Sequence, residues 1–322
     1  MIIFTVILCI FIIKLIGFRP FPLFILASSL VLSGCQSTSI ISSKDNRAQN
    51  FSQRRPNSLS YNDEFNSSKI PEIRIISNDW GAGNHEDILA LLTSVAEIIF
   101  PLGGKAPYNA IWVSRSEQGP IVLYQRGKEG QYIIKLNTQD RYWCQYAFQF
   151  SHELGHILCD YRDGDSSNLW FEESIGEVAS LFALLRLEKS WTQSPPYPHW
   201  KDYAPEFTKY AKERIKKYEN EIPKNLPAWF ERNKELLCKE PVDRPRNVSL
   251  AIRLLPLFDK SPLGWSACAF LNEKKSKTPR SFDLYLSDWY EACPLPEQKS
   301  FVQKIGTKFG FTLPFKEDFY QD

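Results

Sequence analysis

The sequence has almost no net charge once its N-terminus is set aside. Formal net charge is +2 over 322 residues, and Lys14 and Arg19 account for both excess positive charges because the first 34 residues contain no acid. The remainder has no basic stripe and no lysine-rich amphipathic stretch. We therefore do not expect binding to nucleic acid, or to a membrane surface through a basic helix.

Cysteine, histidine and methionine are also scarce, with seven, four and one of each. The cysteines of the second half, Cys238, Cys268 and Cys293, do not have the paired spacing of a zinc finger. No internal repeat is found, so a repeat architecture is not indicated. Apolar residues make up 43% of the chain and aromatic residues 14%, which is enough to bury a core of ordinary size.

The N-terminal 34 residues are apolar but interrupted. A membrane-spanning helix needs about 20 consecutive apolar residues, and Lys14, Arg19, Pro20 and Pro22 break the stretch so that neither half makes a clean span. The second half has the order of a signal peptide, in which Arg19 precedes an apolar region at 21–32 and then small residues. We therefore predict a signal peptide over residues 1–34.

The sequence "LSGC" at residues 32–35 resembles the lipobox of bacterial lipoproteins. This resemblance implies cleavage after Gly34 and lipid attachment to Cys35. Gln36, in place of an aspartate, then implies the outer membrane, so we expect a lipid-anchored protein on its periplasmic face in the bacterial cell envelope. A plain secretory signal with an incidental cysteine is the alternative. Residues 35–70 are rich in Ser, Asn, Gln and Arg and predict a disordered tether.

The rest of the chain, residues 71–322, predicts one domain. Glycine-rich turns separate short apolar runs typical of strands, and "GKEG" predicts a hairpin between the last two. Helical spacing of apolar residues follows, with proline breaks, to the end of the chain. The expected strands are 72–77, 110–114, 120–126 and 131–137. The expected fold class is α+β, a small mixed sheet followed by a mainly helical region.

One helix contains the motif His-Glu-x-x-His, formed by His152, Glu153 and His156. Residues four apart are separated by about 40° around a helix axis and lie one turn apart, so both imidazoles can reach one ion. Zinc accepts neutral imidazole nitrogen and, in catalytic sites, keeps one position for water. Glu153 is poorly placed to bind the same ion and well placed to deprotonate that water.

Two surface histidines beside a glutamate would be the plain structural interpretation. The motif is, however, flanked by large apolar side chains, which predict a buried helix: Phe148, Phe150, Leu154, Ile157 and Leu158. Burying two histidines and a glutamate is costly unless they are paired or bound to a metal. We therefore predict one catalytic zinc ion.

The third metal ligand has three candidate sources. The metzincin pattern fails because Cys159 and Arg162 stand where it needs glycine and histidine. Carboxylates of the loop at 160–165 are possible, although a flexible loop orients a ligand poorly. The third source is the next helix, which begins with "WFEESIGE" at 170–177.

This segment resembles the third-ligand helix of the gluzincins, the thermolysin-like and aminopeptidase-like zinc metallopeptidases. The resemblance covers residues 120–187 and implies a zincin-like fold, a peptide or protein substrate and Glu173 as the third zinc ligand. Glu177 falls where the family has an acid that orients a metal histidine. The alternative is an ordinary helix start with acids near the positive end of the dipole. The aminopeptidase motif Gly-x-Met-Glu-Asn is absent, which favours an endopeptidase.

The family also implies further parts of the site. Its sheet edge pairs with extended substrate, and the strand at 131–137 occupies that position in sequence. Its members supply a Tyr or His that stabilises the oxyanion, and "PPYPHWKDY" offers Tyr203 and His199, with Tyr197 as a third candidate. A proline-rich aromatic surface loop is the alternative. Gly155 and Gly176 predict a close crossing of the two helices.

Three functions are compatible with these patterns. The first is a zinc metallopeptidase with Glu153 as general base. The second is a non-catalytic, zinc-stabilised binding lipoprotein, against which Glu153 argues because structural zinc needs no base. The third is a zinc hydrolase that acts on a non-peptide bond.

Overall fold

The structure is a computed structural model, and it describes residues 70–274 and 276–313. The predicted signal peptide, the lipidation site at Cys35 and nearly all of the predicted tether lie outside these residues. Within the described part of the chain, no helix combines the length and apolar character needed to cross a bilayer.

The strands form a four-stranded mixed sheet in the order β1-β2-β4-β3. Their bounds are Ile73–Ile75 (β1), Ile111–Arg115 (β2), Ile121–Val122 (β3) and Tyr132–Leu136 (β4). The first three in spatial order are parallel, and β3 runs antiparallel to β4. The predicted small mixed sheet and the predicted hairpin between β3 and β4 are therefore confirmed.

The edge of this sheet differs from the sequence prediction. The strand at 131–137 was expected to be the edge that pairs with substrate, but β4 lies between β2 and β3. The hairpin folds the short β3 onto the outer side of β4, so β3 is the edge strand. Residues of an antiparallel strand alternate between facing the partner strand and facing away with their backbone groups. Leu123 faces β4, since its N–H donates to the carbonyl of Ile133, and the preceding residue Val122 therefore points its backbone groups away from β4.

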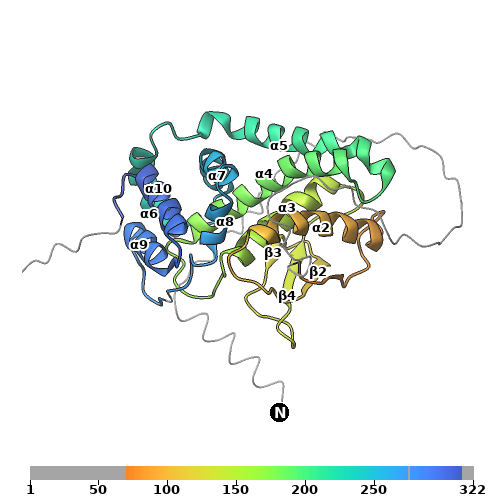
Figure 1. Cartoon of the computed structure of the whole chain (residues 1–322), viewed down its shortest axis with the longest axis horizontal. Coiled ribbons are helices and arrows are strands. Elements are labelled where there is room, and N and C mark those ends of the chain that lie inside the picture. Colours follow the sequence, from red (N-terminus) through yellow and green to blue (C-terminus); the bar gives the residue numbers. More distant parts are fainter. Residues whose placement is uncertain (1–69, 275, 314–322) are drawn as a thin grey trace, which may run out of the picture. The chain divides into compact units, whose positions relative to one another are not determined.

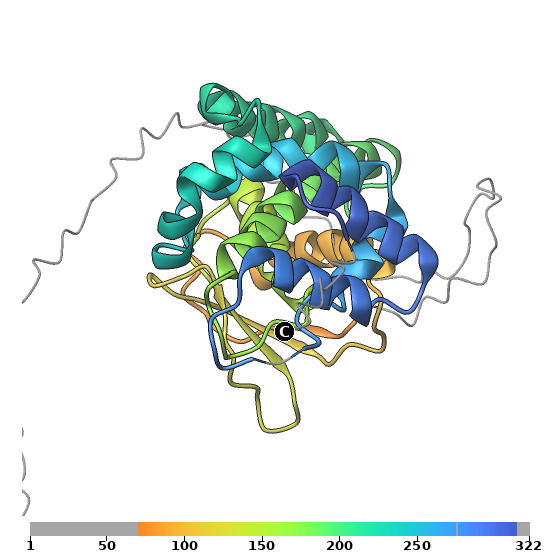
Figure 2. The ribbon, with the colours of Figure 1, turned by 90° about the vertical axis from the view of Figure 1, so that its left-hand side faces the viewer.

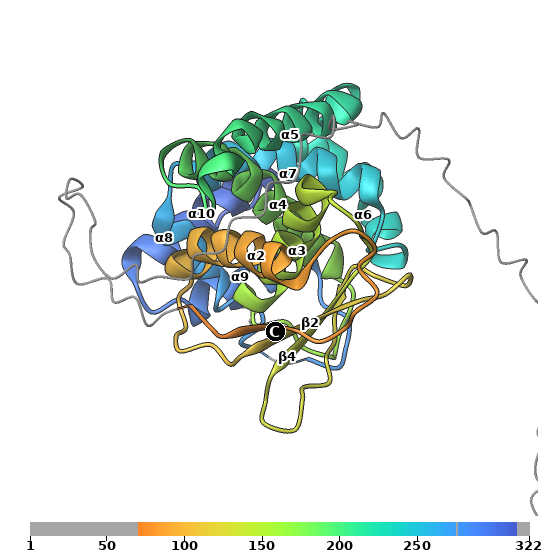
Figure 3. The same ribbon diagram turned by 90° about the vertical axis from the view of Figure 1, so that its right-hand side faces the viewer.

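Apart from α2, which lies between β1 and β2 in the chain, the described helices follow the sheet, as predicted for this α+β chain. They are α2 (His85–Ile99), α3 (Trp143–Leu158), α4 (Leu169–Gln193), α5 (Ala204–Tyr218), α6 (Leu226–Lys239), α7 (Arg244–Asp259), α8 (Pro262–Cys268), α9 (Phe282–Ala292) and α10 (Pro296–Phe309). Short 3-10 turns lie at Phe100–Leu102, Pro198–Tyr203 and Glu219–Glu221. Helices α2 and α3 lie between the sheet and α4, and α5 runs along the far side of α4 (Figures 1 and 3).

Helix α4 is the central helix of the domain. It is apolar around most of its circumference and buried along most of its 25 residues, so it needs partners on every side. Its first turn packs into an aromatic cluster: the ring centroids of Trp170 and Phe171 lie 4.7 and 5.1 Å from that of Phe282 on α9. Figure 2 shows the C-terminal helices, drawn in blue, on the side of the molecule that faces the viewer. They therefore hold the start of α4 immediately before its paired glutamates.

Helix α3 is fixed to both the sheet and α4. The side-chain amide of Gln149 accepts from the N–H of Asn137 and donates to its carbonyl, both at 2.8 Å. The Ser180 hydroxyl donates to the carbonyl of Phe148, also at 2.8 Å. These contacts set the position of α3 along the end of β4.

Two polar residues before α3, Thr138 and Asp140, are of types that often cap helices, but neither caps this one. The helix begins at Trp143 without a side-chain cap. Asp140 has a positive φ of 54° and accepts from the N–H of Ala82 at 2.8 Å. It therefore holds the glycine-rich turn before α2 instead of capping α3.

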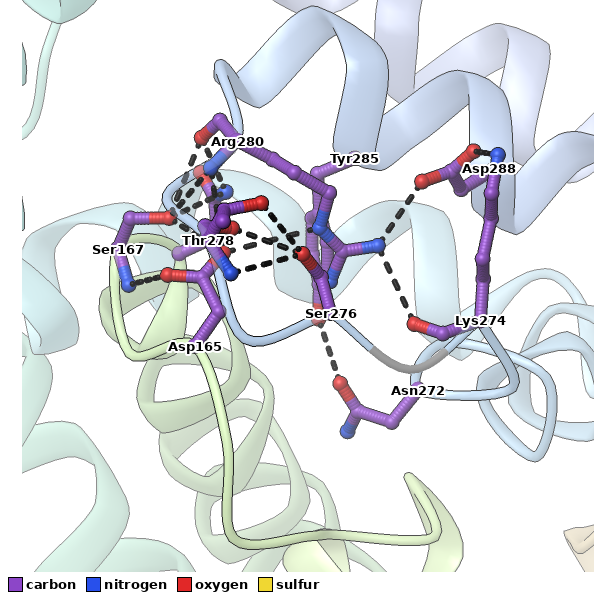
Figure 4. A network of polar contacts seen from close by, with 10 residues as sticks. Asp165, Ser167, Asn272, Lys274, Ser276, Thr278, Arg280, Tyr285 and Asp288 are labelled. Carbon is purple, nitrogen blue, oxygen red and sulfur yellow. Dashed lines mark hydrogen bonds and ion pairs between the residues drawn. The ribbon is translucent and has the colours of Figure 1, made fainter.

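A polar network ties the α3–α4 connection to the segment before α9 (Figure 4). Asp165 accepts from the N–H and hydroxyl of Ser167 at 2.9 and 2.8 Å and from the N–H of Arg280 at 3.2 Å. The guanidinium of Arg280 continues the network to Asp288 at 2.8 Å. Asp165 is nearly buried, with 4% of its side chain exposed, so the network restrains the approach to α4.

We expect Asp165→Ala to lower the free energy of unfolding by about 2–4 kcal/mol, because it leaves the part-buried donors of Ser167 and Arg280 without this acceptor. Urea unfolding followed by circular dichroism measures this change. Asp163→Ala, an exposed aspartate in the same loop, is the control and should change stability by less than about 0.5 kcal/mol. Equal effects of the two substitutions would contradict a structural role for the network.

Candidate metal centre

The two helices that carry the candidate ligands cross at a pair of glycines. A Cβ atom at Gly155 would lie 2.9 Å from the Cα of Gly176, and one at Gly176 would lie 2.9 Å from two ring atoms of His152. Neither position has room for a side chain, so the backbones approach closely and the imidazole fills the space beside Gly176. The predicted close crossing at these glycines is confirmed.

Three predicted ligands converge at this crossing. The Nε2 atom of His152 lies 3.2 Å from Oε2 of Glu173, and the Nε2 atom of His156 lies 3.6 Å from Oε1 of the same carboxylate. The three ligand groups have donor atoms that all lie within 4.8 Å of one another. Donors placed tetrahedrally at about 2.0–2.1 Å from zinc would be about 3.3–3.4 Å apart. The group could therefore hold one metal ion.

The charge of the surroundings also fits a cation. The carboxylates of Glu153, Glu172 and Glu177 are 2–5% exposed and lie, with Glu173, around two imidazoles and one largely exposed arginine, Arg244. Buried carboxylates are costly unless they are paired or bound to a metal. Oε2 of Glu177 is buried and accepts no hydrogen bond from any described residue. A divalent cation would offset this excess of negative charge.

Glu172 contacts His156 at Nδ1, the ring nitrogen that does not face Glu173. Its Oε1 lies 2.6 Å from Nδ1 of His156, and its Oε2 accepts from Nδ2 of Asn272 at 2.7 Å. Asn272 in turn accepts from the hydroxyl of Tyr285 on α9 at 3.0 Å and donates to the carbonyl of Cys159. With Nδ1–H donated to Glu172, the Nε2 lone pair of His156 faces Glu173.

This contact corrects the sequence prediction for Glu172. The sequence puts Glu173 at the ligand position, and Glu172 is 100° away around the same helix, so Glu172 was not expected to reach the histidines. The two adjacent glutamates reach different atoms from α4, Glu173 toward Nε2 of both rings and Glu172 toward Nδ1 of His156. Asn272, about 100 residues farther along the chain, carries no sequence signal for this role.

Glu177 lies beside the first histidine, as the resemblance implied. Its Oε1 is 3.9 Å from Nδ1 of His152 and 3.9 Å from Nε of Arg244 on α7. Both distances are longer than a hydrogen bond and short enough for electrostatic attraction. The arginine was not anticipated from the sequence.

The pKa values show how strongly these groups interact. Burial favours neutral His156, but its hydrogen bond with Glu172 and the nearby carboxylate charges outweigh burial and raise its pKa to about 10. Burial raises the pKa of Glu153, although both histidines and a backbone hydrogen bond with Val122 oppose it. A carboxylate with a raised pKa is a stronger proton acceptor. A metal ion would displace protons from the imidazoles.

A cavity of about 330 Å³ opens over the three candidate ligands. Pro120, Ile121 and Val122 of the β3 edge form part of its wall, and Glu153 lies among the lining residues. Residues of α5 and α7 form another part, namely Tyr210, Arg214, Arg244 and Asn247. The cavity therefore joins the metal ligands, a candidate base and the β3 edge of the sheet.

The structure does not bring Tyr203 or His199 to this cavity, which corrects their predicted position. His199 is exposed and stacks on Tyr197, with ring centroids 5.7 Å apart. The Tyr203 hydroxyl lies 3.3 Å from Sγ of Cys144. Trp200 between them stacks on Trp191 at 4.9 Å, and neither Tyr203 nor His199 lines the cavity. Tyrosines that line the cavity are Tyr124, Tyr161 and Tyr210.

Comparison with known proteins assigns neither a family nor a function to the chain. No protein-family model, curated protein or solved structure matches the chain. The class of site is therefore defined by its own geometry, two imidazoles and a carboxylate converging beside a buried glutamate. The resemblance of residues 120–187 to the gluzincins stays a prediction.

We expect Glu173→Ala to lose most zinc affinity and Glu172→Ala to lose about 10–100-fold, because the first removes a donor atom and the second frees the ring of His156. Glu177→Ala should lower zinc affinity by a similar factor, because it removes the carboxylate beside His152. Competition with a chromophoric chelator measures each dissociation constant.

Glu188→Ala, farther along α4 from the crossing, is the matched control and should bind zinc as the parent does. Circular dichroism of each apo protein shows whether the helices are retained. Parental affinity in Glu172→Ala would show that His156 does not depend on this carboxylate.

Proposed function

We propose that the protein is a zinc-dependent metallopeptidase with a zincin-like fold that hydrolyses peptide bonds, as an endopeptidase rather than an aminopeptidase. The observation that supports this most is the position of Glu153, a buried carboxylate beside His152, His156 and Glu173. Structural zinc sites usually have four protein ligands and no base. A three-ligand group with an adjacent carboxylate has the composition of a catalytic site.

Each side chain has a distinct role in this proposal. A zinc ion, when bound, would supply Lewis acidity to the scissile carbonyl and acidify the attacking water. The carboxylate of Glu153 accepts a proton from that water and then transfers it to the leaving nitrogen. Glu172 and Glu177 orient the imidazoles through their Nδ1 atoms. The raised pKa of Glu153, caused chiefly by burial, suits it to carrying a proton between these two steps.

The β3 edge supports a peptide as the substrate. Val122 directs its backbone groups away from β4 at the margin of the cavity, and the neighbouring Ile121 is 43% exposed. The N–H of Val122 donates to the Glu153 carboxylate, which leaves the Val122 carbonyl for a substrate. An extended peptide can add to such an edge through main-chain hydrogen bonds, which require little side-chain specificity. This observation favours peptide over non-peptide hydrolysis. The buried base in turn disfavours a non-catalytic zinc-stabilised binding protein.

We expect Glu153→Gln to retain zinc and lose hydrolysis, because the amide keeps the size of the side chain and cannot accept the proton. Zinc analysis combined with mass spectrometry of a broad peptide-library digest tests both halves of this expectation. Glu188→Gln, which carries the same change of charge away from the cavity, should keep activity.

Full hydrolysis by Glu153→Gln would remove the proposed mechanism. A parent protein that binds zinc and cleaves nothing in the library would favour the binding function instead.

We also propose export and lipidation, on the basis of the sequence at 32–35. Cys35→Ser should abolish incorporation of labelled fatty acid in a bacterial host and leave an uncleaved precursor or a soluble form, because the thiol that receives lipid is gone. Cys9→Ser should not change labelling, since that cysteine precedes the cleavage point. Unmodified parent protein in the cytosol would contradict this proposal.

A further inference from the structure

The α5 and α7 wall of the metal cavity presents two arginines. Arg214 on α5 and Arg244 at the first position of α7 both line the cavity. The two guanidinium groups come from helices that lie on the side of α4 away from the sheet (Figure 3). One cavity therefore combines a cluster of carboxylates at its ligand end with cationic groups on another wall.

Arg214 has no carboxylate partner among the described residues. Its guanidinium lies over the ring of Phe148, with Cζ 4.1 Å from the ring centroid. No described acid forms an ion pair with it, and its Nε is buried without a hydrogen-bond acceptor. A buried donor without an acceptor carries a desolvation cost. The stacking on Phe148 orients this guanidinium but does not satisfy its Nε–H.

Arg244 is only weakly paired. Its described ion pair is with Glu177, whose Oε1 lies 3.9 Å away and equally far from His152, and 55% of the arginine side chain is exposed. Its charge also helps to lower the pKa of Glu173. The adjacent Asp243 is occupied, since it caps α7 and pairs with Arg246. Most of the hydrogen-bonding capacity of Arg244 is therefore available to a ligand in the cavity.

The carboxylates of the site do not require Arg214 as a counter-ion. Glu172 already interacts with His156 and Asn272, and Glu173 with both histidines. Arg214 contacts none of them. Its charge is thus not accounted for by the candidate metal centre.

We propose that Arg214 and Arg244 form a subsite that binds a carboxylate of the substrate, so that the site prefers acidic peptides. This inference rests on the proposed peptidase function and adds the substrate class. Guanidinium groups bind carboxylates through paired, charge-assisted hydrogen bonds. In an unmodified peptide the carboxylate comes from an Asp or Glu side chain or from the C-terminus.

Peptide hydroxamates test this without turnover, because the hydroxamate group binds zinc and the appended residue reports the subsite. Four probes of one scaffold suffice: a Glu and a Gln side chain with an amidated C-terminus, and a free and an amidated C-terminus with a neutral side chain. Their dissociation constants are measured with the zinc-loaded full-length protein.

At least one carboxylate probe should bind about 10–100-fold tighter than its neutral counterpart, and the preference should shrink as salt is added. A preference for the Glu probe assigns a side-chain carboxylate, and one for the free C-terminus assigns the terminal group. Arg214→Gln and Arg244→Gln should each remove most of the preference and leave binding of the neutral probes unchanged. If Arg214→Gln does not fold, the exposed Arg244 provides the test alone.

Lys212→Gln on α5 and Arg253→Gln on α7 are exposed and do not line the cavity, so they control for net charge and should keep the preference. Equal affinity for charged and neutral probes in the parent would overturn the subsite and leave the peptidase proposal intact. Failure of every probe together with failure to bind zinc would overturn the peptidase proposal, and the subsite with it.

Discussion

The whole candidate site depends on how closely α3 and α4 approach each other. Two glycines, Gly155 and Gly176, remove the side chains that would hold the backbones apart, and the ring of His152 occupies the space that a Cβ at Gly176 would need. Glycine inside a helix costs about 1 kcal/mol relative to alanine. The cost is offset where it lets a short glutamate side chain on one helix reach two imidazoles on the other.

The helical region after α4 has a structural role in the site. Tyr285 and Asn272 connect α9 and the loop before it to Glu172 and through it to His156. The aromatic packing of Trp170 and Phe171 and the network around Asp165 hold the same end of α4. A metal ligand keeps its affinity only if its ring is oriented, so the C-terminal helices and the motif helix form one unit. Helices α5 and α7 supply the arginines of the cavity wall.

The sequence predicted features that depend on local interactions and failed for features that depend on contacts between distant residues. Local patterns identified the strand and helix order, the hairpin at 127–130, the motif helix and the glycine crossing. They misplaced the sheet edge, since alternation of apolar residues cannot tell an inner strand such as β4 from the short β3. They also misplaced Glu172, because a helical wheel describes one helix and not its crossing angle with another. Tyr203 and His199 were chosen for their chemistry, and neither lines the cavity.

What the sequence by itself determined is the chemistry of the candidate centre: His152, Glu153 and His156 have a spacing that any α-helix converts into adjacent rings and a neighbouring carboxylate. The resemblance to the gluzincins also pointed to the helix that follows for the third donor, with the loop at 160–165 as the alternative. Only the tertiary structure decided which of two adjacent glutamates meets the Nε2 atoms, which strand edge borders the cavity and which arginines line it. Those outcomes depend on contacts between residues about 20 to 100 positions apart. The angle and separation of packed helices determine them, and no local pattern encodes either.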